Sequence, residues 1–519
     1  MRFTGAMAIA AVLFGAGNQA GAQPQPFHLE ETTITSIHAA FASGKLTCVQ
    51  LTGLYLARIE AYNLKGPALH AIITVNPNAL TTAAELDRQY RANRSGAGPL
   101  HCVPIILKDN FDTDDMPTTG GNVSLKNSRP LEDAFVVNRM RRADALILAK
   151  ANMQEFARGG MSISSLGGQV LNPYDLTRTP GGSSGGTGAS IAANLGLIGT
   201  GSDTGQSIRS PASANNLVGV RPTRGLVSRR GVIPASETQD EVGPIARTVT
   251  DAALLLDVMA GYDGGDPVTA YGGGHIPKSY TNLLKPDALK GARIGMMADL
   301  FGFGEPHEPV NSVMRVAIAK MEALGATIIR FKLPNYEAFA SNIDTSTLEG
   351  RVVMDRYFAA LGPNAPVKSF AQLVAAKTSA VQKTLENELS IRDGMNSDLY
   401  KTRMLNRERL RIAVARAMAD MNLDAILYPH QRILVAPITA ADQLERNGAL
   451  SNGTGYPAVT FPAGFSTPSA SAPLGVPVGA ELLGADFSEG KLLAYAYAFE
   501  QATHWRKLPP STPPLRGEP

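Results

Sequence analysis

Short hydrophobic runs alternate with amphipathic segments over most of the chain. Apolar runs rich in Val and Ile predict buried strands, whereas apolar residues repeated every three or four positions predict helices. We therefore expect strands at about 68–75, 102–107, 145–150, 292–297, 327–330, 424–429 and 458–461, and helices at about 79–93, 135–142 and 308–324. Such alternation predicts an α/β fold.

Local signals mark where some of these segments begin and end. Thr47 and Gln50 have the spacing of a helix capping box, so a helix is expected to start there and to continue to about Tyr62. Glycine-rich sequence after Gly261 predicts a loop-rich break. Residues 340–420 carry long charged stretches and few strand signals, so we expect them to be mostly helical.

Composition narrows the class of protein. A chain of 519 residues that is 44% hydrophobic can bury a large core. The formal net charge is only +3 and aromatic residues make up 6% of the chain, so no nucleic-acid partner is expected. The eight histidines are scattered and there are two cysteines, which offers no metal-ligand spacing. We expect neither a metal nor a cofactor.

The N-terminus resembles a secretory signal peptide. Arg2 supplies a positive charge, residues 6–15 are apolar, and residues 20–22 have the small-x-small pattern of a cleavage site, so we expect cleavage near Ala22. The apolar stretch is too short to cross a membrane. The expected product is residues 23–519, periplasmic or secreted and without a membrane anchor. In an oxidising compartment Cys48 and Cys102 can form a disulfide, but the sequence leaves this pairing open.

The candidate chemistry lies in two glycine-rich loops, which contain Ser183 and Ser207. Glycine lets the backbone approach a substrate closely, so that N–H groups can bind an oxyanion beside a nucleophilic hydroxyl. A serine nucleophile needs a base, and no histidine lies in a context that recommends it. Lys108 follows an apolar strand-like run, where burial would lower its pKa and let it accept a proton.

Three motifs in this order resemble those of the amidase signature family. They are Pro-Ile-Ile-Leu-Lys-Asp-Asn at 104–110, Gly-Gly-Ser-Ser-Gly-Gly at 181–186, and Gly-Ser-Asp-Thr-Gly-Gln-Ser-Ile-Arg at 201–209. The resemblance continues through later segments and spans about residues 30–510. It implies one large domain, with a mixed central β-sheet covered by helices on both sides. The helical segment 340–420 falls where the family varies, and is expected to shape the substrate entrance.

The resemblance also implies roles for individual residues. Ser207 would be the nucleophile that forms an acyl-enzyme, Ser183 a bridging serine preceded by a cis peptide bond, and Lys108 the base. The backbone N–H groups of Thr204, Gly205, Gln206 and Ser207 would form the oxyanion hole. The expected activity is hydrolysis of a small-molecule amide to an acid and an amine or ammonia. The resemblance does not identify the natural amide substrate, and it leaves open whether the protein forms a homodimer.

Neighbouring residues have structural interpretations. Asp203 and Arg209 flank the nucleophile and are expected to brace its loop, and Ser184 is expected to hydrogen-bond within its own loop. Cys102 enters an apolar strand, so a buried inert thiol is favoured over a nucleophile. The commonest family pattern has glycine where this chain has Gln206, which puts the oxyanion geometry and the shape of the acyl site in question.

Other functional interpretations fit parts of the sequence. The segment 181–185 also fits Gly-x-Ser-x-Gly, in which Ser183 would be the nucleophile of an α/β-hydrolase elbow. That motif requires a preceding buried strand, whereas residues 171–180 are rich in prolines and turn formers. Two further alternatives are an amidotransferase-type subunit of a larger complex and a catalytically inactive binding protein on the same scaffold.

Overall fold

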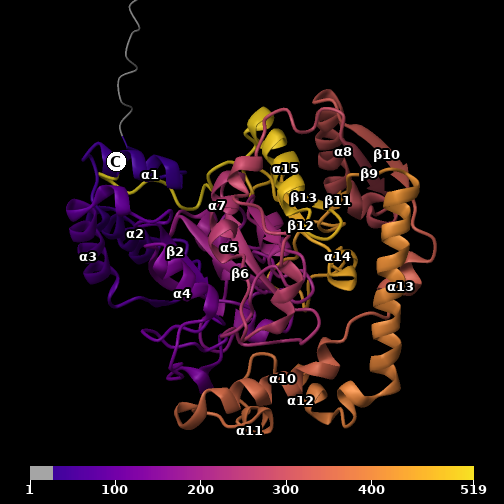
Figure 1. The fold of residues 1–519 in the computed structure, drawn as a ribbon, viewed down its shortest axis with the longest axis horizontal. Coiled ribbons are helices and arrows are strands. Elements are labelled where there is room, and N and C mark those ends of the chain that lie inside the picture. The colour runs from indigo at the N-terminus through magenta and orange to yellow at the C-terminus, as the bar shows by residue number, and fades with distance from the viewer. Residues whose placement is uncertain (1–26) are drawn as a thin grey trace, which may run out of the picture.

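A large mixed β-sheet forms the centre of the protein (Figure 1). The computed structural model describes residues 27–519, so the predicted signal peptide at 1–22 lies outside the described residues. The sheet comprises β1 (Ile72–Val75), β2 (Pro104–Lys108), β3 (Leu146–Ala151), β6 (Ile198–Asp203), β7 (Val218–Arg221), β8 (Glu241–Ala246), β9 (Arg293–Met297), β10 (Thr327–Phe331), β11 (Ala425–Pro429), β12 (Ala458–Phe465) and β13 (Pro477–Leu483). Their spatial order is β1-β3-β2-β6-β8-β7-β12-β13-β11-β9-β10.

Strand direction places two functional segments at one edge of this sheet. Strands β3, β2 and β6 are parallel neighbours, and Ile106 of β2 pairs with Gly199 of β6. Parallel strands end at the same edge of a sheet. Lys108 is the last residue of β2 and Asp203 is the last residue of β6. The end of β2 and the loop that leaves β6 are therefore adjacent, although 92 positions separate Lys108 from Thr200, whose hydroxyl accepts its backbone N–H.

Helices flank the sheet on both sides (Figure 1). They are α1 (Ile34–Ala42), α2 (Cys48–Tyr62), α3 (Ala79–Ala92), α4 (Phe135–Arg142), α5 (Gly185–Ala192), α6 (Arg209–Ala214), α7 (Val249–Met259), α8 (Glu308–Ala323), α9 (Tyr336–Ala340), α10 (Ser346–Ala360), α11 (Phe370–Ala375), α12 (Gln382–Ser390), α13 (Asp398–Asp420), α14 (Ala449–Thr454) and α15 (Glu489–Thr503). Helices α5 and α6 contact each other and the central strands, whereas α15 packs on β12 and on α7. No helix within residues 27–519 is long and apolar enough to span a membrane.

Most predicted elements are confirmed. Thr47 and Gln50 form a reciprocal capping box at the start of α2, and α4 has its predicted bounds. The strands predicted at 292–297 and 327–330 and the helix predicted between them form a βαβ unit, since β9 and β10 are parallel and α8 connects them. The predicted strand at 68–75 is shorter, because Ala68 and His70 have φ of 49° and 53° and interrupt an extended backbone. The strand at 102–107 likewise begins later, since Cys102 has φ of 54°.

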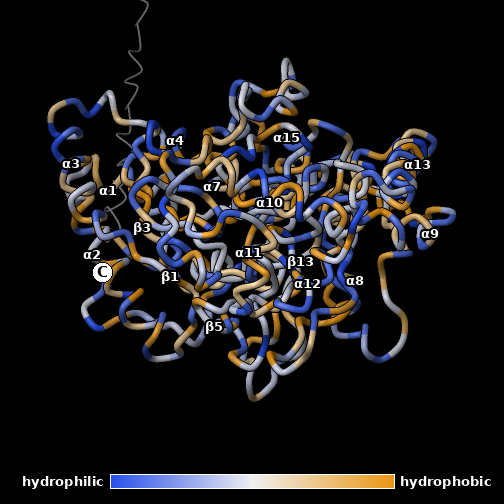
Figure 2. Tube along the Cα trace, turned by 90° about the horizontal axis from the view of Figure 1, so that it is seen from below, coloured by the Kyte–Doolittle hydropathy of each residue, from blue (hydrophilic) through white to orange (hydrophobic). Residues whose placement is uncertain are grey.

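The predicted helical segment at 340–420 is confirmed and includes α10, α11, α12 and α13. In Figure 1 the first three form the orange group at the lower edge, and the long α13 leads back toward the sheet. Phe358, Phe370 and Leu385 form a small hydrophobic core there together with Phe156. Hydrophilic positions are frequent along the outer helices, for example α3 and α13 (Figure 2). Helices α10, α11 and α12 thus pack against Phe156 and Ile233 through this small core.

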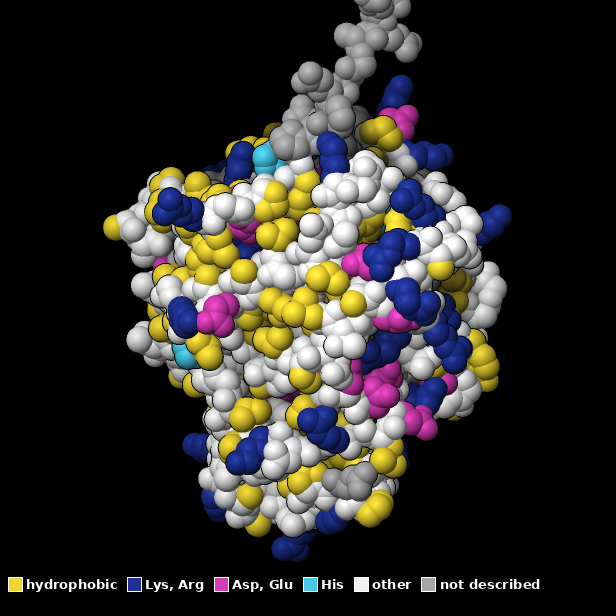
Figure 3. All heavy atoms as spheres, turned by 90° about the vertical axis from the view of Figure 1, so that its left-hand side faces the viewer, with side chains coloured by type: hydrophobic (Ala, Val, Ile, Leu, Met, Phe, Trp, Pro, Cys, Tyr) yellow, Lys and Arg dark blue, Asp and Glu magenta, His cyan; other side chains and the backbone are white. Residues whose placement is uncertain are grey.

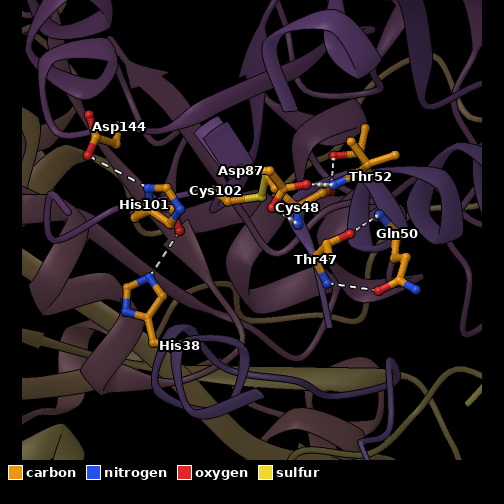
Figure 4. The surroundings of a disulfide bond; sticks show 10 residues. His38, Thr47, Cys48, Gln50, Thr52, Asp87, His101, Cys102 and Asp144 are labelled. Atoms are coloured by element: carbon orange, nitrogen blue, oxygen red, sulfur yellow. Dashed lines mark hydrogen bonds and ion pairs between the residues drawn. A yellow bond between two sulfur atoms is a disulfide. The ribbon is translucent and has the colours of Figure 1, made fainter. Parts of the chain in front are cut away.

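A disulfide bond joins Cys48, the first residue of α2, to Cys102, which precedes β2 (Figure 4). The two Cα atoms lie 5.7 Å apart, within the range that a disulfide requires. The Asp87 carboxylate accepts the backbone N–H of Cys48 at 2.8 Å. The bond therefore fixes the N-terminal helices to the strand that carries Lys108, and leaves Cys102 no free thiol.

Candidate active site

Lys108 ends strand β2 with its ammonium nitrogen fully buried. Its Nζ donates to the Ser183 Oγ at 2.7 Å, to the Ser202 Oγ at 2.8 Å and to the Ser202 carbonyl at 3.2 Å. Burial lowers the pKa of Lys108 to about 7, although the charges of Asp203 and Asp240 oppose this shift. A substantial fraction of Lys108 is therefore neutral near pH 7, when it can accept a proton.

Ser183 lies in a tight loop before α5. The Gly182–Ser183 peptide bond is cis, as the family resemblance implied. Gly181 has φ of 73°, and a Cβ on it would lie 2.8 Å from the Ser210 carbonyl oxygen in α6, so the close approach of this loop to α6 requires glycine there. The Ser184 N–H donates to the Ser207 carbonyl at 3.2 Å, which joins the two serine loops directly.

The strand context of Ser183 does not fit a nucleophile elbow. Residues 170–182 contain no strand, whereas the elbow must follow directly on a buried one. The Ser184 hydroxyl donates at 3.4 Å to the carbonyl of Ser202 on strand β6, so it bonds outside its own loop. This corrects the expectation that Ser184 bonds within the loop, because the packing of the loop on β6 brings a carbonyl within reach.

An ion-pair network braces the loop that carries Ser207. The Asp203 carboxylate accepts the Ile208 N–H at 3.1 Å, Nε of Arg209 at 3.1 Å and Nη1 of Arg221 at 2.8 Å. Burial alone would raise the pKa of Asp203, but Arg209 and Arg221 hold it well below its usual range. The expected bracing role of Asp203 and Arg209 is confirmed.

A second carboxylate completes this network from strand β13. Arg209 donates to Glu481 at 2.7 Å, and Glu481 also accepts from Tyr428 at 2.6 Å. His430 Nδ1 lies 2.7 Å from the other oxygen of Glu481, and the imidazole is buried. His430 therefore belongs to the network that holds the loop of Ser207.

A cavity of about 1060 Å³ opens above Ser207. Thr204, Gly205, Gln206 and Ser207 all line it, while its far walls come from 154–169, 340–347, 380–388 and 438–452. Ser207 is 6% exposed, whereas Ser183 and Lys108 are completely buried. Of the three candidate residues, Ser207 is thus the one that a substrate in the cavity can reach.

Sequence reasoning missed two polar side chains of this site. Ser202 contacts Lys108, and Asn110 donates to the Ser202 Oγ at 2.9 Å. Both lie inside the motifs already quoted. A buried lysine needs acceptors for its N–H groups. Ser202, which precedes Asp203 at the end of a strand, could therefore have been predicted as one of these acceptors. Among residues 27–519, no group of three or more His, Cys, Asp or Glu side chains is placed to hold a metal.

Comparisons with known proteins identify the family of this chain. A profile of the Amidase family matches residues 50–493. A protein of Arabidopsis thaliana described as a probable amidase is 35% identical over 93% of this chain and 92% of its own length. A glutamyl-tRNA(Gln) amidotransferase subunit of Halorhodospira halophila is 34% identical over 93% of this chain and 99% of its own.

A solved structure gives the same result. The native peptide amidase from Stenotrophomonas maltophilia superposes with a TM-score of 0.85 at 36% identity, covering 93% of this chain and 99% of that one. The family match, the shared fold and the three motifs lead to one conclusion. The chain belongs to the amidase signature family and is an amidase, a hydrolase of amide C–N bonds.

Proposed function

We propose that the chain is an exported amidase that cleaves its substrate through an acyl-enzyme on Ser207, with Ser183 and Lys108 as the proton relay. The observation that carries this proposal is the contact between the Lys108 Nζ and the Ser183 Oγ at 2.7 Å. A lysine whose pKa is about 7 can serve as a base at neutral pH.

The relay moves one proton through three side chains. Neutral Lys108 takes the proton of Ser183, Ser183 takes that of Ser207, and the Ser207 oxygen attacks the amide carbon. Collapse of the tetrahedral intermediate breaks the C–N bond, and the amine leaves with a proton returned through Ser183. Water then attacks the ester on Ser207 through the same relay, which releases the acid and restores the serine.

Backbone geometry supports an oxyanion hole made of N–H groups from Thr204 to Ser207. Three successive carbonyls of this loop accept hydrogen bonds from the surrounding protein: that of Thr204 from Gln239 (3.2 Å), that of Gly205 from Arg209 (2.6 Å) and that of Gln206 from Ser210 (2.8 Å). In a trans peptide the N–H points opposite to the carbonyl. The following N–H groups are therefore turned away from these partners, as an oxyanion hole beside the cavity requires.

The substrate we propose is the amide of a peptide or of an N-acyl amino acid. The structural similarity to a peptide amidase supports this class. The cavity of about 1060 Å³ has room for more than a small aliphatic amide. Its lining is rich in polar and charged side chains, which suits a substrate with backbone carbonyl and N–H groups.

Export rests on the predicted signal peptide at 1–22 and is supported by the disulfide between Cys48 and Cys102. Structural disulfides persist in oxidising compartments such as the periplasm. Expression of the full chain in a Gram-negative host, fractionation and N-terminal sequencing test this proposal. We expect periplasmic protein that begins at Gln23, and cytoplasmic protein with an intact N-terminus would contradict it.

An amidotransferase-type subunit is the second candidate, because relatives described as glutamyl-tRNA(Gln) amidotransferase subunits are matched over almost their full length. The charge distribution favours a hydrolase without a nucleic-acid partner. The net charge is only +3, and on the upper and middle parts of the face shown in Figure 3 acidic side chains lie among the basic ones. The third candidate, an inactive binding protein, conflicts with the joint presence of Lys108, Ser183 and Ser207.

Hydrolysis assays with the isolated chain separate these three candidates. We expect the wild type to release ammonia from N-acetyl-L-phenylalaninamide without any added protein, and Ser207→Ala to lose this activity. Equal behaviour of the two proteins in every amide assay would overturn the enzyme proposal. Activity that appears only with partner proteins of a complex would favour the amidotransferase.

A further inference from the structure

Gln206, the residue directly before the nucleophile, turns its side chain toward the substrate cavity. With its amide oxygen facing Arg446, it accepts from Nε at 2.8 Å and from Nη1 at 3.0 Å. Arg446 belongs to the loop between β11 and α14, which forms one wall of the cavity. The position that departs from the usual glycine therefore holds a guanidinium group beside the reactive serine.

Packing fixes Arg446 from its other side. A Cβ on Gly160 would lie 1.7 Å from Nη1 of Arg446, so the guanidinium rests directly on that backbone. Gly160 in turn packs on the loop of Ser183, since a Cβ on Gly182 would lie 2.9 Å from the Gly160 carbonyl carbon. Arg446 thus lies between Gln206 and Gly160, whose backbone packs on the loop of Ser183, and a side chain at 160 would displace the guanidinium.

The charge of Arg446 is only partly compensated. Asp442 lies 3.7 Å away, beyond hydrogen-bond distance, and its side chain is 51% exposed. Glu445 is the adjacent acid, but its carboxylate pairs with His307 at 2.7 Å and with Arg432 at 3.3 Å. Burial lowers the pKa of Arg446, and Asp442 offsets this only in part. A partly buried guanidinium with free donor capacity favours an oxygen acceptor on the ligand.

We infer that Arg446, oriented by Gln206, is a specificity-determining residue that binds an oxygen acceptor on the acyl half of the substrate. The acceptor is either the carbonyl of a preceding peptide or N-acyl group, or a carboxylate. This inference rests on the proposed hydrolase function and deepens it, because it names the feature that an accepted amide must carry. Gln206 is a positioning residue for Arg446, in addition to its proposed backbone role.

Three amides with the same phenyl group test this inference. 3-Phenylpropanamide has no oxygen acceptor besides its scissile amide group. N-acetyl-L-phenylalaninamide adds the carbonyl of its acetyl group, and N-succinyl-L-phenylalaninamide adds a carbonyl and a carboxylate. The readout is the ratio of kcat/KM for each acceptor substrate to that for 3-phenylpropanamide. A hydrogen bond to a charged group corresponds to roughly 10- to 150-fold in this ratio. We expect Arg446→Met to lower the ratio by that factor, mainly through KM.

Control variants separate specificity from general damage. Arg432→Met removes the same charge from the same loop but does not line the cavity, so it is expected to keep the wild-type ratio. Arg446→Lys keeps the charge but cannot reproduce the two bonds to Gln206, and is expected to give an intermediate ratio. This variant also serves as the test if Arg446→Met does not fold.

The outcomes are distinct. A larger loss on the succinyl substrate identifies a carboxylate as the acceptor, and equal losses on both acceptor substrates identify the carbonyl. Wild-type ratios within twofold in both Arg446 variants would overturn the inference while leaving the hydrolase proposal intact. Failure of the wild type to hydrolyse any of the amides would instead overturn the proposed function, and with it this inference.

Discussion

The side-chain nitrogen of Lys108 lies 2.7 Å from the hydroxyl oxygen of Ser183, and both groups are fully buried. A charged lysine at this depth would be costly without a carboxylate in contact. The acceptors that surround Nζ are uncharged hydroxyl and carbonyl oxygens, which favour the ammonium form less than a carboxylate would. In the relay proposed above, this contact is the step that passes a proton between Ser183 and the lysine.

The pH dependence of catalysis should follow Lys108. Its pKa is lowered to about 7, and only the neutral form accepts a proton, so kcat/KM should rise with pH through about 7 and level off above it. A pH profile with a neutral amide substrate measures this directly. Lys108→Met should lose at least about 10²-fold in kcat at every pH. An optimum near pH 5 would show that another group is the base.

Ser202 should position Lys108 and tune it. Ser202→Ala removes an acceptor that favours the charged amine, so the rising limb of the pH profile should shift to lower pH. We expect kcat to fall by about tenfold, because Nζ loses one of its orienting bonds. A purely structural role would change stability alone, and an unshifted limb with wild-type kcat would exclude the positioning role.

The carboxylate of Asp203 should be essential for stability. Asp203→Asn leaves the buried charge of Arg221 without its ion pair, and breaking such a pair costs about 3–5 kcal/mol. Chemical denaturation of the variant measures the free energy of unfolding. The matched control is Asp420→Asn, which removes an exposed pair with Arg416 and should cost less than about 1 kcal/mol. Equal effects of the two substitutions would refute the bracing role.

The disulfide should stabilise the folded chain. Cys48 and Cys102 are 54 positions apart, and closing a loop of this size contributes about 2–4 kcal/mol. The Cys48→Ala/Cys102→Ala double variant should unfold at lower denaturant concentration than the wild type. Reducing agent should lower the stability of the wild type and leave the double variant unchanged, which distinguishes the bond from packing of the side chains. Insensitivity of the wild type to reduction would contradict its presence.

The sequence was most informative where chemistry imposes local patterns. The capping box of Thr47 and Gln50, the limits of α4 and the position of Lys108 at a strand end all follow from short-range rules. Positive φ at Ala68 and Cys102 could not be predicted, because tertiary packing selects it against the preference of these residues.

Contacts between residues far apart along the chain also could not be predicted from the sequence. Asp203 and Arg209 were expected to brace the nucleophile loop, but Glu481 joins them from a strand 272 positions further along. The contact of Gln206 with Arg446 likewise joins segments that no local pattern connects. The motifs identified the candidate residues of the site, and only the fold could identify the side chains that hold and surround them.

Ser207 as the nucleophile is the central claim, and a fluorophosphonate probe tests it most directly. The purified protein is treated with the probe, its intact mass is measured and the adduct is located by peptide mapping. The account predicts one adduct per chain, on Ser207, and none in Ser207→Ala. An adduct on Ser183 instead would contradict the account and restore the nucleophile-elbow interpretation.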